Sequence, residues 1–235
     1  MRLRRIFALH LSLLLLACGG GAANQAGAAA PSSEQARDRI PRQRSVERYV
    51  AMLESPGRAR WQRPDALVAS LGIEPGFTVA DLGTGSGYFL PQLDAAVGES
   101  GRVVAQDIDQ DLVDFVRGRA VREGLDRVVP LLGEPADPHL EPDTYDLILM
   151  VDVYHHVSQP APFLAHVRRA LRPGGRFLVF DFAPGDHVPT EVSGTAHRIE
   201  PARVIADGEA AGLVLRGHRD WEPYQFVVEL TRPTE

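Results

Sequence analysis

The sequence predicts an α/β protein with a doubly wound, mostly parallel sheet of seven strands and helices on both faces. Two observations support this fold class. Short apolar runs recur along the chain after residue 41, and segments of roughly 10–15 residues with helical apolar spacing separate most of them. The runs are nearly continuous rather than alternating, which is typical of strands that are covered on both faces. This succession of strands and helices favours a parallel sheet.

Seven apolar runs are predicted as strands. The first ends in a glycine-rich loop and the second ends in an acidic residue, while the last two form closing strands in the tail of the chain. The strands are expected at 77–82, 102–107, 127–132, 145–151, 175–182, 213–215 and 225–230.

Four segments have the apolar spacing of helices that bury one face. Asp65 can cap the first of them, because an N-cap carboxylate accepts from a free backbone N–H, and Gly72 is its stop. Residues 172–175 close the third helix, and Pro201 suits the first turn of the fourth. The helices are expected at 65–72, 112–124, 163–171 and 201–212.

Composition excludes several chemistries. Of the 235 residues, 25 are basic and 31 are acidic, and every basic residue is an arginine. Without lysine the protein cannot use a Walker-A lysine, a Schiff base to pyridoxal phosphate or a Ser-Lys dyad. The single cysteine excludes an intramolecular disulfide, a CxxC redox pair and a zinc site of several thiolates. The net charge of -6 argues against nucleic-acid binding, so no nucleic-acid partner is expected.

The N-terminal segment resembles a bacterial lipoprotein signal. Arginines precede an apolar run over 6–16, which is shorter than the roughly 20 residues that a permanent membrane helix needs. Small residues lead into Cys18, as in a lipobox, where the cysteine is lipidated and becomes the new N-terminus. The resemblance implies a signal peptide at 1–17, a flexible tether at 18–40 and a domain at 41–235.

This resemblance also implies where in the cell the protein is located. The chain is expected to be exported and anchored to a membrane through a lipid on Cys18, on the periplasmic side of the bacterial cell envelope. Two alternatives stay open: an ordinary signal peptide with a chance cysteine, and an accidental leader from a wrongly assigned start codon.

The loop after the first predicted strand carries three glycines at alternate positions. Residues 81–88 read D-L-G-T-G-S-G-Y, and glycine lets the backbone turn sharply and approach a ligand where any Cβ would intrude. The loop differs from the dinucleotide fingerprint G-x-G-x-x-G, because the third glycine of that pattern would fall at Tyr88. It resembles the signature of class I S-adenosylmethionine-dependent methyltransferases, which have a Rossmann-like sheet. The resemblance implies that S-adenosylmethionine is bound by Asp81, Gly83, Thr84, Gly85, Gly87 and Tyr88.

Later segments follow in the order that this family requires, and the resemblance covers about residues 45–230. Asp107 ends the second strand and is implied to accept hydrogen bonds from the ribose hydroxyls, with Ile108 next to it in the cofactor site. Asp109 could share or replace the role of Asp107. The stretch 171–180 is similar to the family's turn into its fifth strand.

The segment 133–146 resembles the family's adenine-binding region. It places Glu134 where an acid accepts from the adenine amino group, and it places Pro135 beside the ring. Because proline has no N–H to donate, Ala136 or Asp137 could take over that hydrogen bond.

The end of the fourth predicted strand supplies candidates for the chemistry. Methyl transfer from a sulfonium is an in-line displacement, so the protein mainly positions the acceptor and excludes water. The resemblance places Asp152 beside the methionine part of the cofactor, and Tyr154 and His155 in the acceptor pocket. His155 is the preferred general base. For His156 the alternative is structural, a ring that hydrogen-bonds backbone at the start of the next loop.

Two segments outside the sheet are expected to border the site. Residues 49–63 carry aromatics and arginines where this fold commonly has a lid, and an arginine there would suit the methionine carboxylate. The alternative is that Trp61 only packs this helix against the sheet. The Gly/Pro-rich stretch 183–197 is expected to cover the acceptor side. No metal is expected, because only the distant His187 or His197 could complete a ligand set with the adjacent histidines.

Residues 61–65 and 154–156 resemble a group of uncharacterised bacterial methyltransferases related to quinone and arsenite methylating enzymes, although the chain lacks the thiols for arsenite chemistry. The expected function is methyl transfer to a small or lipid-soluble acceptor near a membrane. Two alternatives stay open: a non-catalytic lipoprotein that binds S-adenosylmethionine or S-adenosylhomocysteine, and a protein methyltransferase of the isoaspartyl type.

Overall fold

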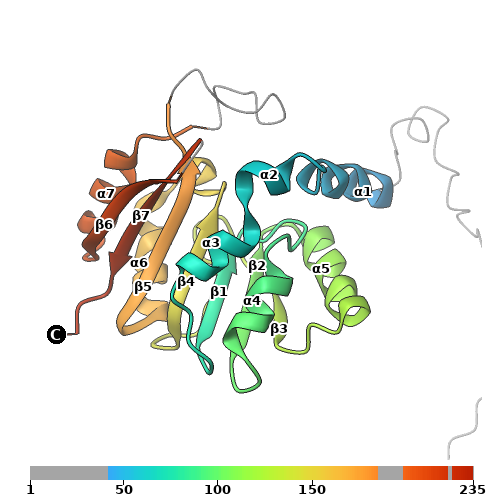
Figure 1. Cartoon of the computed structure of the whole chain (residues 1–235). Coiled ribbons are helices and arrows are strands. Elements are labelled where there is room, and N and C mark those ends of the chain that lie inside the picture. Colours follow the sequence, from blue (N-terminus) through green and yellow to red (C-terminus); the bar gives the residue numbers. More distant parts are fainter. Residues whose placement is uncertain (1–41, 185–197, 222–223, 235) are drawn as a thin grey trace, which may run out of the picture. The chain divides into compact units, whose positions relative to one another are not determined.

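Seven strands form one sheet at the centre of the computed structural model, in the order β3-β2-β1-β4-β5-β7-β6 (Figure 1). β1 to β5 pair in parallel, whereas β7 is antiparallel to both β5 and β6. The predicted doubly wound, mostly parallel sheet is therefore confirmed. The strands are β1 (Thr78–Leu82), β2 (Arg102–Asp107), β3 (Val128–Leu132), β4 (Tyr145–Val151), β5 (Leu171–Phe182), β6 (Val214–Trp221) and β7 (Gln225–Thr231).

The structure describes residues 42–184, 198–221 and 224–234, which belong to one compact unit. The expected signal peptide, Cys18 and tether lie outside these residues, as do His187 and His197. Within the described ranges, no helix is both long enough and apolar enough to cross a bilayer.

Helices cover both faces of the sheet and separate its core into two layers. α3, α4 and α5 pack on one face, and α6 and α7 pack on the other. Alternate residues of β4 point to the two layers: Leu147 and Leu149 face the first, whereas Ile148 and Met150 face the second. Burial on both faces explains why this strand is apolar throughout. The helices are α1 (Arg42–Leu53), α2 (Arg58–Gln62), α3 (Pro64–Ser70), α4 (Leu90–Val97), α5 (Gln110–Glu123), the 3-10 turn η1 (Tyr154–His156), α6 (Pro160–Ala170) and α7 (Pro201–Ala210).

The structure differs from the sequence prediction in several details, and α4 was not predicted at all. α3 begins at Pro64 with Arg63 as its N-cap, so Asp65 lies in the first turn instead of capping the helix. β5 begins at Leu171, and residues 172–175 form an irregularity in its pairing with β4 rather than a closing turn before the strand. β6 continues to Trp221 because backbone pairing with β7 holds it, although almost all of its side chains are exposed.

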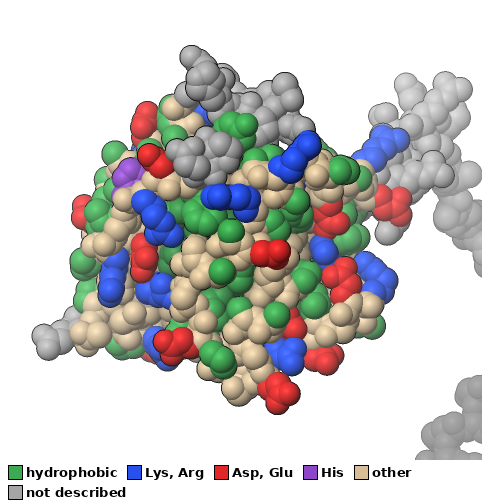
Figure 2. Space-filling model, viewed as in Figure 1, with side chains coloured by type: hydrophobic (Ala, Val, Ile, Leu, Met, Phe, Trp, Pro, Cys, Tyr) green, Lys and Arg blue, Asp and Glu red, His purple; other side chains and the backbone are tan. Residues whose placement is uncertain are grey.

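The surface carries mixed charge on the face shown in Figure 2. Arginine and acidic side chains are interspersed there among apolar ones, without a large area of a single sign.

Candidate active site

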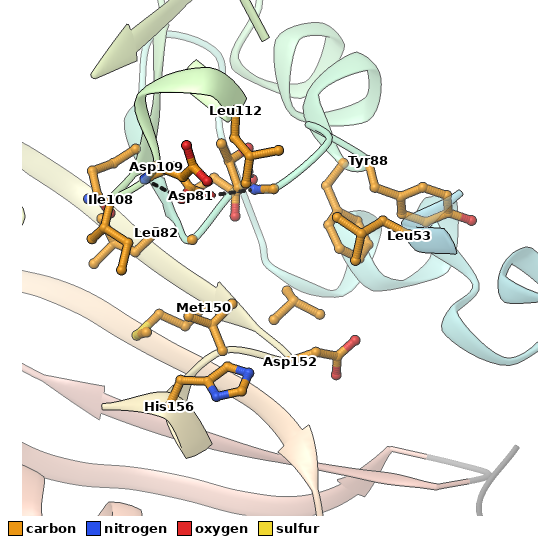
Figure 3. A pocket seen from close by; sticks show the side chains of 18 of the residues that line it. Leu53, Asp81, Leu82, Tyr88, Ile108, Asp109, Leu112, Met150, Asp152 and His156 are labelled. Atoms are coloured by element: carbon orange, nitrogen blue, oxygen red, sulfur yellow. Dashed lines mark hydrogen bonds between the residues drawn. The ribbon is translucent and has the colours of Figure 1, made fainter. Parts of the chain in front are cut away.

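A cavity of about 630 Å³ opens at the carboxyl ends of the parallel strands. Its lining comes from the loops after β1, β2, β3 and β4, from Phe182 at the end of β5, and from α1 and α2. The strand order reverses between β1 and β4, which is the place where open α/β sheets bind their ligands. Figure 3 shows Asp109 and Leu112 at one end of the cavity and Asp152 and His156 at the other.

The glycine loop forms one wall of the cavity. Gly83 and Gly85 both line it and have φ values of +70° and +57°, which L side chains rarely adopt. A Cβ on Gly83 would lie 2.6 Å from Cγ1 of Val153, so any other residue there would require Val153 to move. Gly87 is not part of the lining, and a Cβ on it would lie 2.6 Å from Cδ1 of Leu90. In this structure Gly87 packs the loop against α4, and its contact with the cofactor stays a prediction.

Asp107 lies in the cavity wall at the end of β2. Its carboxylate accepts from the backbone N–H of Gly85 at 2.9 Å and from that of Asp109 at 3.0 Å (dashed lines in Figure 3). A carboxylate has about four lone-pair sites, so acceptor capacity remains for two ribose hydroxyls. Burial raises the pKa of Asp107, while the backbone hydrogen bonds lower it.

Asp109 is engaged elsewhere. Its side chain accepts from the N–H of Asp111 at 2.9 Å and so caps α5. Although Asp109 lines the cavity, this cap makes Asp107 the better acceptor for a ribose.

The adenine end of the predicted cofactor site is built around Pro135. Glu134 and Pro135 line the cavity together with Ile108, whose apolar side chain is 58% exposed. The N–H of Asp137 donates to the carbonyl of Glu134 at 3.2 Å, which closes a turn with proline at its second position. The N–H of Asp137 is thus used within the turn and does not replace the N–H that Pro135 lacks.

Asp81 lies at the base of the glycine loop and is buried. Its carboxylate accepts from the hydroxyl of Thr84 at 2.8 Å, which fixes the start of the loop. Burial raises the pKa of Asp81 to about 6, against the lowering effect of this hydrogen bond. Thr84 and Tyr88 also line the cavity, and the guanidinium of Arg58 lies 4.3 Å from the centre of the Tyr88 ring.

Asp152 belongs to a buried polar network at the end of β4. It contacts Arg58 of α2 at 3.5 Å and accepts a hydrogen bond from Gln225 of β7. Gln225 in turn accepts from Gln62 at 3.1 Å, and Gln62 accepts from Arg58 at 3.3 Å, so the network closes on itself. Asp152 also has a φ of +60°, a strained conformation of the kind that clusters at functional sites. Sequence reasoning identified Asp152 and expected an arginine from residues 49–63, the segment that contains Arg58, but it missed Gln225.

Burial raises the pKa of Asp152 to about 7, with nearby Asp181 raising it and Arg58 lowering it. In the unfolded chain an aspartate has a pKa of about 3.9. Between these two values the folded protein holds a proton that the unfolded chain has lost, so this group makes the free energy of unfolding fall as pH rises from about 4 to about 7.

We therefore expect Asp152→Asn to flatten the pH dependence of stability in that range. Denaturant unfolding of both proteins at several pH values between 4 and 8 measures the difference. An equal decline of stability in wild type and variant would contradict the raised pKa. Asp81, whose pKa is also raised, contributes equally to the pH dependence of both proteins, so the difference between them reports Asp152.

The histidines after β4 line the part of the cavity where the acceptor is expected. His155 and His156 both line it, and Nδ1 of His155 lies 2.7 Å from Oδ1 of Asp181 on β5. Tyr154 does not line the cavity, and its hydroxyl donates to Asp207 of α7 at 3.2 Å. The placement of Tyr154 in the acceptor pocket is therefore wrong, because the η1 turn directs this residue into the core under α7.

α1 and α2 cover one side of the cavity with apolar side chains. Tyr49, Met52 and Leu53 of α1 and Trp61 of α2 line it. The Trp61 ring packs on Phe182 with centroids 5.6 Å apart, so it does join this segment to the sheet. Its indole N–H, however, is buried without a hydrogen-bond partner among the described residues, which leaves a donor available to a ligand.

Across the described ranges, no three His, Cys, Asp or Glu side chains gather in a way that could hold a metal ion.

Known proteins are similar to this domain in sequence and in structure. Residues 80–179 match the family model described as "Methyltransferase domain". An S-adenosylmethionine-dependent methyltransferase from Aquifex aeolicus has a similar structure, with a TM-score of 0.71 and 28% identity, covering 78% of this chain and 96% of that one. The cyclase SpnF has the same fold, with a TM-score of 0.63 and 17% identity over 77% of this chain and 86% of its own.

Curated relatives are similar over part of their length. The chain is 34% identical over 164 residues to an uncharacterised 37.1 kDa protein in transposon TN4556 of Streptomyces fradiae, which covers 68% of this chain and 47% of the relative. It is 34% identical over 113 residues to the ubiquinone/menaquinone biosynthesis C-methyltransferase UbiE of Hydrogenovibrio crunogenus, covering 48% of this chain and 44% of the relative. The chain thus spans about half the length of these relatives.

Fold, cavity and matched domain agree on the class. Residues 80–179 are similar to a methyltransferase domain, the sheet has the fold of S-adenosylmethionine-dependent methyltransferases, and both similarities imply S-adenosylmethionine as the cofactor. The cavity fits this cofactor, since Asp107 keeps acceptor capacity for a ribose beside an apolar surface that includes Ile108.

Proposed function

We propose that this protein transfers the methyl group of S-adenosylmethionine to a small or lipid-soluble acceptor. The observation that carries the proposal is a single cavity with a ribose-type acceptor, Asp107, on one wall and a carboxylate-paired histidine, His155, on another. A site that only binds the cofactor has no need of the second group.

The residues divide between holding the cofactor and handling the acceptor. S-adenosylmethionine supplies a methyl group on a sulfonium, and the C–S electron pair leaves with sulfur. Gly83, Gly85 and Asp107 hold the nucleoside part. Arg58 and Asp152 lie where the methionine part is expected, and His155 receives the proton that the acceptor loses.

The apolar mouth of the cavity supports a lipid-soluble acceptor. Tyr49, Met52 and Ile108 line it and are 46%, 56% and 58% exposed, so three large apolar side chains gather at one cavity. The name of the UbiE relative refers to C-methylation in ubiquinone and menaquinone biosynthesis, which also favours an acceptor with a hydroxylated ring. The buried N–H of Trp61 suits an oxygen on such a ring.

Two alternatives differ from this proposal in measurable ways. A non-catalytic lipoprotein that senses S-adenosylmethionine or S-adenosylhomocysteine would bind them without transferring methyl. A protein methyltransferase of the isoaspartyl type would label peptides rather than lipids.

We expect label from methyl-labelled S-adenosylmethionine to appear in the organic phase when the protein is incubated with a membrane extract. Calorimetry with S-adenosylhomocysteine run alongside reports binding. Binding without label in any fraction would establish the non-catalytic alternative, label in protein would favour the isoaspartyl type, and absence of binding would remove all three functions.

Anchoring at Cys18 is part of the proposal. A lipid there would hold the cavity close to a membrane that dissolves its acceptor, and no nucleic-acid partner is proposed. Palmitate labelling of the full chain that disappears in Cys18→Ser tests the anchor, and labelling that persists in the variant would contradict it.

A further inference from the structure

Asp181 is a fully buried carboxylate in contact with the candidate base. Oδ1 accepts from the backbone N–H of Phe182 at 2.8 Å and lies 2.7 Å from Nδ1 of His155, while Oδ2 accepts from the backbone N–H of His155 at 3.1 Å. The side chain of Asp181 has no exposed surface and that of His155 is 4% exposed. These contacts fix both position and orientation of the His155 ring.

The contacts also assign the tautomer of His155. Both oxygens of Asp181 accept backbone N–H groups, so Nδ1 of His155 is assigned as the third donor and the lone pair is on Nε2. That Nε2 lies 3.0 Å from Nε2 of His156, and the two ring centres are 4.1 Å apart. Because two N–H groups cannot face each other at this distance, a single proton lies between the rings.

We propose that Asp181, His155 and His156 form a relay that accepts the proton of the methyl acceptor. This inference rests on the proposed function and adds two residues to it. His156 touches the acceptor, His155 stores the proton, and Asp181 is a positioning residue that stabilises the charge which then develops on His155.

The relay balances in protons and electrons. The acceptor atom forms a bond to the methyl carbon as the C–S bond breaks, and it releases its proton to the His156 ring nitrogen that faces it. His156 passes the proton on Nε2 to Nε2 of His155. His155 becomes an imidazolium 2.7 Å from the buried carboxylate, where an opposite charge stabilises it. No co-reactant beyond cofactor and acceptor is needed.

The tautomer provides a test that needs no acceptor. Long-range ¹H–¹⁵N correlation spectra of the folded protein, assigned with His155→Asn and His156→Asn, should show a protonated Nδ1 on His155 with a proton far downfield. Asp181→Asn should remove that downfield shift. The carboxylate accepts from three N–H groups, whereas an amide has only one acceptor oxygen, and its NH₂ group cannot accept from an N–H. An unprotonated Nδ1 on His155 in the wild type would overturn the relay.

The catalytic test compares rates of label transfer to the membrane extract. His156→Asn and Asp181→Asn should each lower the rate at least about tenfold while S-adenosylhomocysteine affinity stays within about twofold of wild type, since general-base catalysis is worth roughly 10²–10⁴-fold. His218→Asn, an exposed histidine on β6, is the matched control. If Asp181→Asn does not fold, His156→Asn still tests the relay, because His156 is exposed and its replacement should not affect folding.

The two proposals fail in different ways. Transfer at the wild-type rate by His156→Asn would overturn the relay and leave the methyltransferase intact. A wild-type protein that binds S-adenosylhomocysteine but transfers no label would overturn the proposed function.

Discussion

Replacing Asp107 by alanine is expected to weaken S-adenosylhomocysteine binding by about 100-fold or more. Hydrogen bonds to a charged group contribute roughly 1.5–3 kcal/mol each, and the variant loses two of them to the ribose. It also releases the N–H of Gly85, which the carboxylate holds at 2.9 Å, so the glycine loop loses its link to β2. Isothermal titration calorimetry at fixed pH measures the change.

Asp109→Ala is the matched control for that experiment. It removes a carboxylate from the same cavity wall, but one that caps α5. The expected result is a loss of about 1 kcal/mol in unfolding free energy with nearly unchanged binding. If Asp109→Ala weakened binding more than Asp107→Ala, Asp109 and not Asp107 would be the residue that accepts hydrogen bonds from the ribose.

Gly83→Ala is expected to lower the free energy of unfolding by about 2–5 kcal/mol. One part is backbone strain at a φ of +70°, roughly 1–2 kcal/mol for a residue with a Cβ. The other is overpacking against Val153, where the new Cβ would lie 2.6 Å from Cγ1 and cost about 1–3 kcal/mol. Denaturant unfolding measures the total.

Two further variants separate these contributions. Gly124 has a similar φ of +66° and open space around it, so Gly124→Ala reports the strain alone. In the double variant Gly83→Ala with Val153→Ala, the clash is relieved and a double-mutant cycle should give a favourable coupling energy. Additive effects of the two substitutions would show that a Cβ at position 83 does not clash with Val153.

The predictable part of the site lies close together in sequence. The glycine loop and Asp107 follow directly from strand ends, where the pattern fixes both the residue and its place at the edge of the sheet. The strands themselves are predicted to within a residue or two where both faces are buried, as in β4. β6 extends beyond its prediction because an exposed edge strand has no apolar pattern to mark it.

The unpredicted part depends on contacts between distant segments. Gln225 reaches the site because β7 inserts beside β5, 163 residues along the chain from its partner Gln62. Asp181 is an ordinary strand residue in sequence, and only pairing of β4 with β5 places it against His155. Tyr154 was misplaced for the converse reason, since a 3-10 turn sends adjacent side chains in different directions and local sequence does not say which.

The ion pair between Arg58 and Asp152 has a kinetic consequence. Arg58 belongs to α2, which covers the cavity, and Asp152 belongs to its floor. Lifting the cover would separate a buried charge pair and leave each partner without compensation, which is unfavourable. Protonation of Asp152 would leave Arg58 facing a neutral group and so weaken this contact. We therefore expect the rate at which the nucleoside leaves, and not only its affinity, to change with pH, which stopped-flow displacement of bound S-adenosylhomocysteine at pH 5 and pH 8 measures.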